Sequence, residues 1–132
     1  MNSKILVVDD NATNLKLISD LLAFEGHEIL QATDAEEAQA VLAHALPDLI
    51  CMDIALPGMD GLTLTRKLKT DERTCRICIV ALTAFAMKGD DQKVLDAGCD
   101  GYITKPIDTR TFPAQIVKFL AATNAHNPPK TI

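Results

Sequence analysis

Two short apolar runs that end in aspartate constrain the fold of this chain more than any other feature. The run at 5–8 is followed by Asp9 and Asp10, and the run at 49–52 is followed by Asp53. An unbroken apolar run of this length is typical of a strand buried on both faces of a parallel sheet. A carboxylate inside such a strand is unfavourable, so we expect the three acids at strand ends, where they reach solvent.

Strand and helix patterns alternate along the chain. Strands are predicted at 4–9, 28–33, 48–53, 77–83 and 101–104, and the segments between them carry apolar residues at helical spacing. No short hairpin turn joins two strands, so the pattern predicts an α/β fold, a doubly wound five-stranded parallel sheet with helices on both faces. The flavodoxin-like order 2-1-3-4-5 fits best, and it makes the first and third strands neighbours.

Glycines and aspartates mark the expected helix ends. Gly26 suits the left-handed position that follows the first helix, and Gly98 ends the fourth. The expected N-caps are Asp34 and Asp60 for the second and third helices and Asp108 or Thr109 for the last helix.

Length and charge narrow the class of protein. The 132 residues fit one domain, which we place at 1–122, followed by an aperiodic C-terminal tail at 123–132 that is expected to be flexible. The net charge of −5, without clustered Lys and Arg, disfavours a nucleic-acid partner. No segment reaches the roughly 20 apolar residues of a membrane helix, and no signal peptide is evident. A cytoplasmic protein without membrane contact is expected.

The four cysteines include one CxxC pair, Cys75 and Cys78. A redox pair of this spacing belongs between a strand and the start of a helix, whereas this pair leads into a predicted strand. A zinc site would need two further ligands nearby. We therefore expect ordinary reduced cysteines, as is usual in a cytosolic core.

The three acids predict a divalent cation. In the predicted strand order Asp9, Asp10 and Asp53 meet at one edge of the sheet, and three neighbouring carboxylates without a counter-charge could not all stay ionised at neutral pH. Oxygen-only ligands select a hard ion, so we expect Mg²⁺, with Mn²⁺ as a substitute. The alternative is that these acids are merely solvated residues at strand ends.

Two further strand ends point to a bound phosphoryl group. The fourth predicted strand ends at Thr83, whose hydroxyl can donate a hydrogen bond to a phosphate oxygen. Lys105 follows the fifth strand and supplies a fixed positive charge. A carboxylate, a lysine, a hydroxyl and Mg²⁺ are the parts needed to move a phosphoryl group onto an aspartate.

These motifs resemble the receiver domain of two-component response regulators. The resemblance rests on Asp9-Asp10, the segment 53–61, Thr83-Ala84 and Lys105-Pro106, and it extends from about residue 4 to 122. The run at 83–90 is also similar to stand-alone bacterial receivers that control cell division and polarity, and to receivers attached to hybrid kinases.

The resemblance implies a role for each acid. Asp53 would accept a phosphoryl group from a phosphohistidine on a sensor histidine kinase or a histidine phosphotransfer protein. Asp10 and Asp53 would bind Mg²⁺ directly, together with the backbone carbonyl of Ala55, and Asp9 would act mainly through water. Lys105 would contact the phosphoryl group, and the peptide bond that follows it is expected to be cis.

The resemblance also implies a switch. Thr83 would move toward the phosphorylated aspartate, and Tyr102 matches the aromatic residue that then turns inward. The output face toward a downstream protein would be the fourth helix, the fifth strand and the fifth helix. The other interpretation of Tyr102 is a half-buried strand tyrosine whose hydroxyl lies in water.

An enzyme is the competing class of protein. Aspartyl-phosphate phosphatases need a second acid two residues after the nucleophile, and Ala55 stands there after Asp53, as Ala12 does after Asp10. A nucleotide or flavin carrier would want a Gly-rich or Ser/Thr-rich loop after the first strand. We therefore expect a signalling protein that catalyses only its own phosphorylation and dephosphorylation. An intermediate phosphorelay carrier, or the receiver portion of a hybrid sensor kinase, remains the alternative.

Overall fold

The computed structural model describes residues 3–56, 58–84 and 90–126, with backbone alone at 90–91 and 123–126. Pro57, and residues 85–89 of the run used for the resemblance, lie outside the described residues. The strands are β1 (Lys4–Val8), β2 (Glu28–Ala32), β3 (Leu49–Asp53), β4 (Cys78–Thr83) and β5 (Gly101–Thr104). The helices are α1 (Ala12–Phe24), α2 (Ala35–Leu42), α3 (Gly61–Lys69), α4 (Asp90–Asp96) and α5 (Phe112–His126).

The five strands form one parallel sheet in the order β2-β1-β3-β4-β5, which confirms the predicted topology. Each predicted strand lies within one residue of an observed strand at both ends. In the register of the central pair, Val8 lies opposite Met52. The residues that follow these two, Asp9 and Asp53, therefore leave the sheet side by side.

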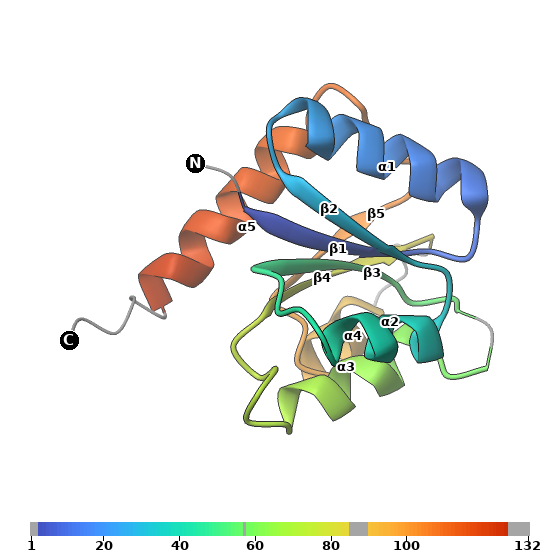
Figure 1. Ribbon diagram of the computed structural model, residues 1–132, viewed down its shortest axis with the longest axis vertical. Helices are drawn as coiled ribbons and strands as arrows, with labels where there is room; N and C mark the ends of the chain where they lie inside the picture. Colours follow the sequence, from blue (N-terminus) through green and yellow to red (C-terminus); the bar gives the residue numbers. More distant parts are fainter. Residues whose placement is uncertain (1–2, 57, 85–89, 127–132) are drawn as a thin grey trace.

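Helices cover both faces of the sheet, as Figure 1 shows, with α1 and α5 on one face and α2, α3 and α4 on the other. Alternate residues of β1 point to opposite sides: Ile5 and Val7 join the core under α1 and α5, while Leu6 and Val8 join the core under α2 and α3. Full burial of one such side chain stabilises the fold by about 1.5–3 kcal/mol. Because both faces are packed, polar groups on the central strands are confined to their ends.

The predicted caps of α2 and α3 are confirmed. The side chain of Asp34 accepts a hydrogen bond from the Glu37 N–H, and that of Asp60 accepts one from the Thr63 N–H, each at 2.7 Å. Gly26 has a φ of 95°, in the left-handed region expected after α1, and Gly98, which follows α4, also lies in that region with a φ of 104°. Asp60 thereby fixes the start of the helix that follows Asp53.

The start of α5 differs from the prediction. The helix begins at Phe112, so neither Asp108 nor Thr109 is its N-cap. Asp108 instead forms a turn, in which its side chain accepts a hydrogen bond from the Arg110 N–H at 2.9 Å and its carbonyl accepts one from the Phe112 N–H at 2.9 Å. An aspartate turn satisfies backbone donors much as a cap does, which is why the sequence pattern placed the helix too early.

The C-terminal end also differs from the prediction. Helix α5 continues to His126, so 123–126 are helical rather than the beginning of a tail. Extending an existing helix adds one hydrogen bond per residue and needs no apolar periodicity. Residues 127–132 of the expected tail lie outside the described residues. In the described part of the chain, no helix has the length and apolar character needed to cross a bilayer.

Candidate functional site

The three aspartates meet where β1 and β3 end. Asp53 is the last residue of β3 and is 3% exposed, whereas Asp9 follows β1 and is completely buried. The expectation that all three acids reach solvent is therefore wrong for these two, because the packing of both faces of the sheet extends to the strand ends. Asp10 is exposed beside them. One carboxylate oxygen from each of the three lies within 4.8 Å of the others, as the strand order predicted.

Local hydrogen bonds orient the two buried carboxylates in the same way. Oδ1 of Asp9 accepts a hydrogen bond from the Asn11 N–H at 2.9 Å, and Oδ1 of Asp53 accepts one from the Ala55 N–H at 3.0 Å. Each bond joins an aspartate side chain to the backbone N–H two residues later, which is the hydrogen bond of an Asx turn. The second oxygen of each carboxylate is thereby left for interactions across the cleft.

Lys105 reaches this cleft from the end of β5. Its Nζ lies 3.2 Å from Oδ2 of Asp53 and 3.6 Å from Oδ2 of Asp9. The Lys105 side chain is only 20% exposed, so the attraction is less screened than at the surface. One ammonium among three carboxylates still leaves an excess of negative charge.

Asp9 is the acid whose ionised form this environment disfavours. Burial raises the pKa of Asp9, and the nearby Asp53 carboxylate adds to the effect, although the Asn11 N–H and the Lys105 ammonium oppose it. Within the part of the chain that the structure describes, Oδ2 of Asp9 is buried without a hydrogen-bond donor. An orphaned carboxylate oxygen beside two further acids, all of them oxygen donors, fits a hard divalent cation such as Mg²⁺.

Thr83 and Lys105 come together at the ends of β4 and β5. Asp53 lies opposite Leu82 in the sheet, so Thr83 lies one residue further toward the same edge. Thr83 is 3% exposed, and its carbonyl accepts a hydrogen bond from the Lys105 N–H at 2.7 Å. The Lys105-Pro106 peptide bond is cis, which confirms that expectation.

Tyr102 lies outside the cleft. It sits opposite Ala81 on β5, and 39% of its surface is exposed. The burial of β5 alternates, so Tyr102 and Thr104 point to one side, while Ile103 points into the core under α1 and α5. The buried Gly101 lies against the ring of Phe119 on α5. The structure thus brings together Asp9, Asp10, Asp53, Thr83 and Lys105, with Ala55 adjacent to them, and leaves the Tyr102 ring at the surface.

Gly61, the last residue of the segment 53–61, has a role at the site that the sequence analysis did not recognise. A Cβ at this position would lie 2.5 Å from the carbonyl oxygen of Asp53 and 2.7 Å from Cα of Ile54. The Gly61 N–H also donates a hydrogen bond to the Ile54 carbonyl at 3.1 Å. Only a residue without a side chain allows α3 to begin this close to Asp53. The sequence did contain a signal for this close approach. A glycine directly follows the predicted N-cap Asp60, at a position where the backbone conformation does not require glycine.

Comparison with known protein families matches residues 5–117 to the response regulator receiver domain. The chain belongs to this family. The match includes the three aspartates, the buried Thr83 and Lys105, so the acidic cleft lies within the receiver domain.

Individual relatives agree with this assignment. The receiver domain is 41% identical over 120 residues to the polar-differentiation response regulator DivK of Brucella ovis, an alignment that covers 91% of this chain and 98% of the relative. This similarity confirms the expected kinship with stand-alone bacterial polarity regulators. DivK of Brucella anthropi is 40% identical over the same length.

Solved structures show the same fold. A putative response regulator from Chloroflexus aurantiacus superposes with a TM-score of 0.86 at 29% identity, covering 92% of this chain and 99% of that one. The receiver domain of the sensor histidine kinase PA1611 from Pseudomonas aeruginosa gives a TM-score of 0.82 at 30% identity, with the same coverage. In that neighbour, a magnesium ion is coordinated in the active site cleft.

Replacing the buried acid with its amide, Asp9→Asn, is expected to stabilise the receiver domain when divalent cations are removed. The raised pKa means that the ionised Asp9 is less favourable in the folded than in the unfolded state at neutral pH. We expect the free energy of unfolding at pH 7 to rise by roughly 0.5–2 kcal/mol. Urea denaturation in the presence of EDTA measures this change.

Asp10→Asn is the matched control, because Asp10 is exposed and its carboxylate needs no desolvation. The free energy of unfolding should rise less in Asp10→Asn than in Asp9→Asn. The gain from Asp9→Asn should also shrink as the pH falls through the raised pKa of folded Asp9. It should vanish below roughly 3, under the unfolded-state pKa of about 3.9, because the aspartate is then mostly protonated in both states. Equal gains from the two variants, or a gain independent of pH, would contradict the electrostatic interpretation of the cleft.

Proposed function

We propose that this receiver domain accepts a phosphoryl group on Asp53 from a phosphohistidine and then changes its contacts with other proteins. The observation that carries the proposal is the position of Lys105, whose Nζ lies 3.2 Å from Oδ2 of Asp53 at the edge where two further acids converge. A lysine contact fixes the oxygen that would react, and it supplies positive charge where phosphate oxygens would arrive.

The proposed transfer makes one bond and breaks one. A carboxylate oxygen of Asp53 attacks phosphorus, the bond between phosphorus and the histidine nitrogen breaks, and that nitrogen leaves with its electron pair. Such transfers depend mainly on positioning and on neutralising charge. Here Lys105 would pair with the phosphoryl oxygens, and the Thr83 hydroxyl would donate a hydrogen bond to them.

The same acids would hold the metal. Asp10 and Asp53 would ligate Mg²⁺ directly, together with the carbonyl of Ala55, while Asp9 would act through a bound water, and Mn²⁺ would substitute. When bound, the ion supplies positive charge that draws the phosphoryl oxygens toward Asp53. The buried oxygen of Asp9 that lacks a donor, and the all-oxygen ligand set, support this assignment.

Phosphorylation would be read out through Thr83 and Tyr102. It exchanges one negative charge on Asp53 for nearly two and adds strong hydrogen-bond acceptors, so Thr83 would move toward them. The half-exposed ring of Tyr102 would then turn inward on β5 and alter the surface formed by α4, β5 and α5. The free energy available to such coupling is typically about 1–3 kcal/mol, enough to shift a population of conformers.

The implied partners are a phosphodonor and a downstream protein. We propose a sensor histidine kinase or a histidine phosphotransfer protein as the donor, acting in the cytoplasm, with the receiver domain at 1–122 carrying the function. The receiver domain of a histidine kinase from Syntrophus aciditrophicus superposes with a TM-score of 0.84 at 28% identity. That similarity favours a second candidate, in which this chain is a phosphorelay carrier or part of a hybrid kinase.

The proposal assigns no reaction on an external substrate. A phosphatase of the aspartyl-phosphate type would need a general acid two residues after its nucleophile. Ala55 occupies that position and contributes its N–H to the Asp53 carboxylate. An alanine side chain cannot protonate a leaving group, so the chemistry would stop at the phosphorylated aspartate until water or a partner removes the group.

Incubation with acetyl phosphate tests the chemistry. With Mg²⁺, the intact protein should gain the mass of one phosphoryl group, whereas Asp53→Asn should gain none and EDTA should abolish the gain. Asp10→Ala should largely abolish it as well. Asp34→Asn, which alters an aspartate at a helix cap instead, is the control and should react like the wild type. Equal modification of Asp53→Asn would refute the assignment.

The switch is tested by Tyr102→Ala. This variant should still be phosphorylated, because Tyr102 does not line the cleft. Beryllofluoride, a mimic of the bound phosphoryl group, should shift amide NMR signals along β5 and α5 in the wild type and only near the cleft in the variant. Tyr102→Phe, which keeps the ring, is the control and should respond like the wild type. Identical shifts in all three proteins would exclude Tyr102 from the switch.

A further inference from the structure

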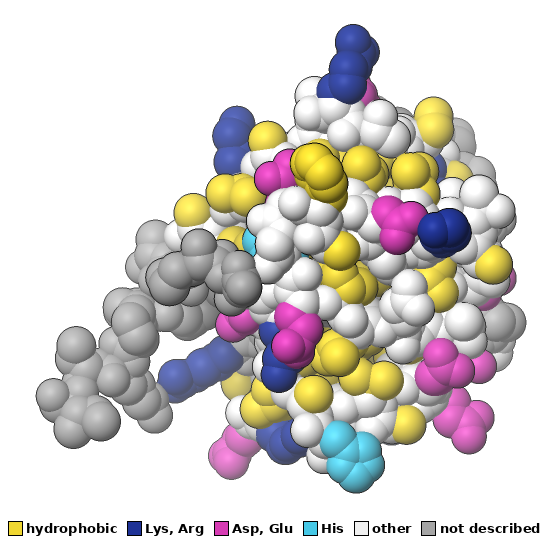
Figure 2. Space-filling model, turned by 45° about the horizontal axis from the view of Figure 1, so that its top comes forward, with side chains coloured by type: hydrophobic (Ala, Val, Ile, Leu, Met, Phe, Trp, Pro, Cys, Tyr) yellow, Lys and Arg dark blue, Asp and Glu magenta, His cyan; other side chains and the backbone are white. Residues whose placement is uncertain are grey.

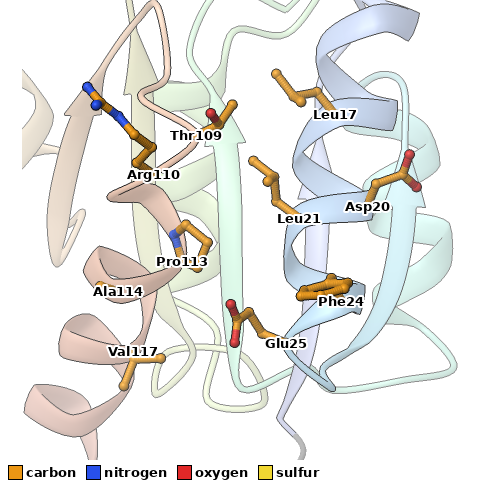
Figure 3. Close-up of a pocket in the computed structure, with 10 residues that line it drawn as sticks. All are labelled: Leu17, Asp20, Leu21, Phe24, Glu25, Thr109, Arg110, Pro113, Ala114 and Val117. Atoms are coloured by element: carbon orange, nitrogen blue, oxygen red, sulfur yellow. The ribbon is translucent and has the colours of Figure 1, made fainter.

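A groove between α1 and α5 lies on the face of the sheet that these two helices cover. Figure 3 shows side chains from both helices on either side of it, and its volume is about 620 Å³. Its apolar lining consists of Leu17, Leu21 and Phe24 from α1 and Pro113, Ala114 and Val117 from α5. None of these residues belongs to the acidic cleft.

The groove exposes more apolar surface than isolated surface residues explain. Phe24 is 91% exposed, Val117 is 51% exposed and Leu17 is 37% exposed. Single exposed apolar residues are common on soluble proteins. Three of them around one hollow, one being an almost bare phenylalanine, are typical of a surface that another protein covers. Figure 2 shows hydrophobic side chains interspersed with acidic and basic ones on the face that it presents.

Charges of opposite sign border the two sides of the groove. Asp20 and Glu25 lie on the side of α1, and Arg110 lies at the start of α5, as Figure 3 shows. Two of these charges already form ion pairs with exposed neighbours. Nζ of Lys16 lies 2.8 Å from Oδ2 of Asp20, and Nε of Arg110 lies 3.5 Å from Oδ1 of Asp108. Exposed pairs of this kind contribute little and are readily exchanged for a new partner.

This distribution selects one way of pairing two copies. A two-fold axis across the groove would place α1 on α1 and α5 on α5, so that like charges face each other. A two-fold axis along the groove places α1 of each copy on α5 of the other, so that acidic and basic borders meet. The same pairing brings the projecting Phe24 of each copy toward the hollow of the other.

We propose that this face is a dimer interface, in which two copies of the chain pack α1 against α5 in both directions. One surface carries the hollow, the aromatic side chain that can fill it and both signs of charge, so it is complementary to itself. The proposal needs no phosphoryl group, and it stands or falls separately from the function of Asp53.

Sedimentation velocity of the unphosphorylated 132-residue chain, from about 1 μM to 1 mM, tests the pairing. The sedimentation coefficient should rise from that of a monomer to that of a dimer. Phe24→Ser should weaken dimerisation at least about tenfold, because truncation of a central aromatic residue commonly does so. Leu46→Ser is the matched control, since Leu46 is 47% exposed and does not line the groove, and it should dimerise like the wild type.

Charge reversal tests the orientation. Asp20→Lys and Arg110→Glu should each weaken the dimer, and the double variant should restore it, because residues 20 and 110 again carry charges of opposite sign. Asp53→Asn should dimerise like the wild type even though it cannot be phosphorylated. A chain that stays monomeric throughout, a dimer insensitive to Phe24→Ser, or a double variant no tighter than the single ones would each overturn the proposal.

Discussion

The parallel pairing of β1 with β3 is the constraint on which the rest of this molecule depends. It places Val8 beside Met52, so the residues that follow, Asp9 and Asp53, emerge together from strands that are buried on both faces. Lys105 then reaches them from the end of β5, two strands away from β3. The site is therefore a property of strand order, since no local segment contains all of its parts.

The buried acids of the cleft lower the stability of the folded domain. Apolar packing on both faces of the sheet excludes water from the base of the cleft, which raises the pKa of Asp9 and leaves its Oδ2 without a donor in the described structure. The same exclusion strengthens the attraction of Lys105 for Asp53 and favours a divalent cation. Under the proposed function, binding of a divalent cation would recover the free energy lost to this crowded set of acids, which would make the cleft responsive to the metal.

Much of this arrangement could be predicted from the sequence because its signals are local. Buried strands appear as apolar runs. The caps at Asp34 and Asp60 each depend on a hydrogen bond from the backbone N–H only three residues later in the sequence. Features set by packing between distant segments could not be read in this way. The space that requires Gly61, and the hollow beside Phe24, exist only once helices are placed on the sheet. The start of α5 was predicted wrongly because a turn at Asp108 imitates a cap.

The most direct test of the account is to locate the cation. Paramagnetic Mn²⁺, added in small amounts to ¹⁵N-labelled protein, broadens the amide signals nearest to its binding site. We predict that the signals of Asp10, Asp53 and Ala55 disappear first and that excess Mg²⁺ restores them. Broadening centred on another acidic surface, such as Glu36 and Glu37 at the start of α2, or no selective broadening at all, would contradict the account.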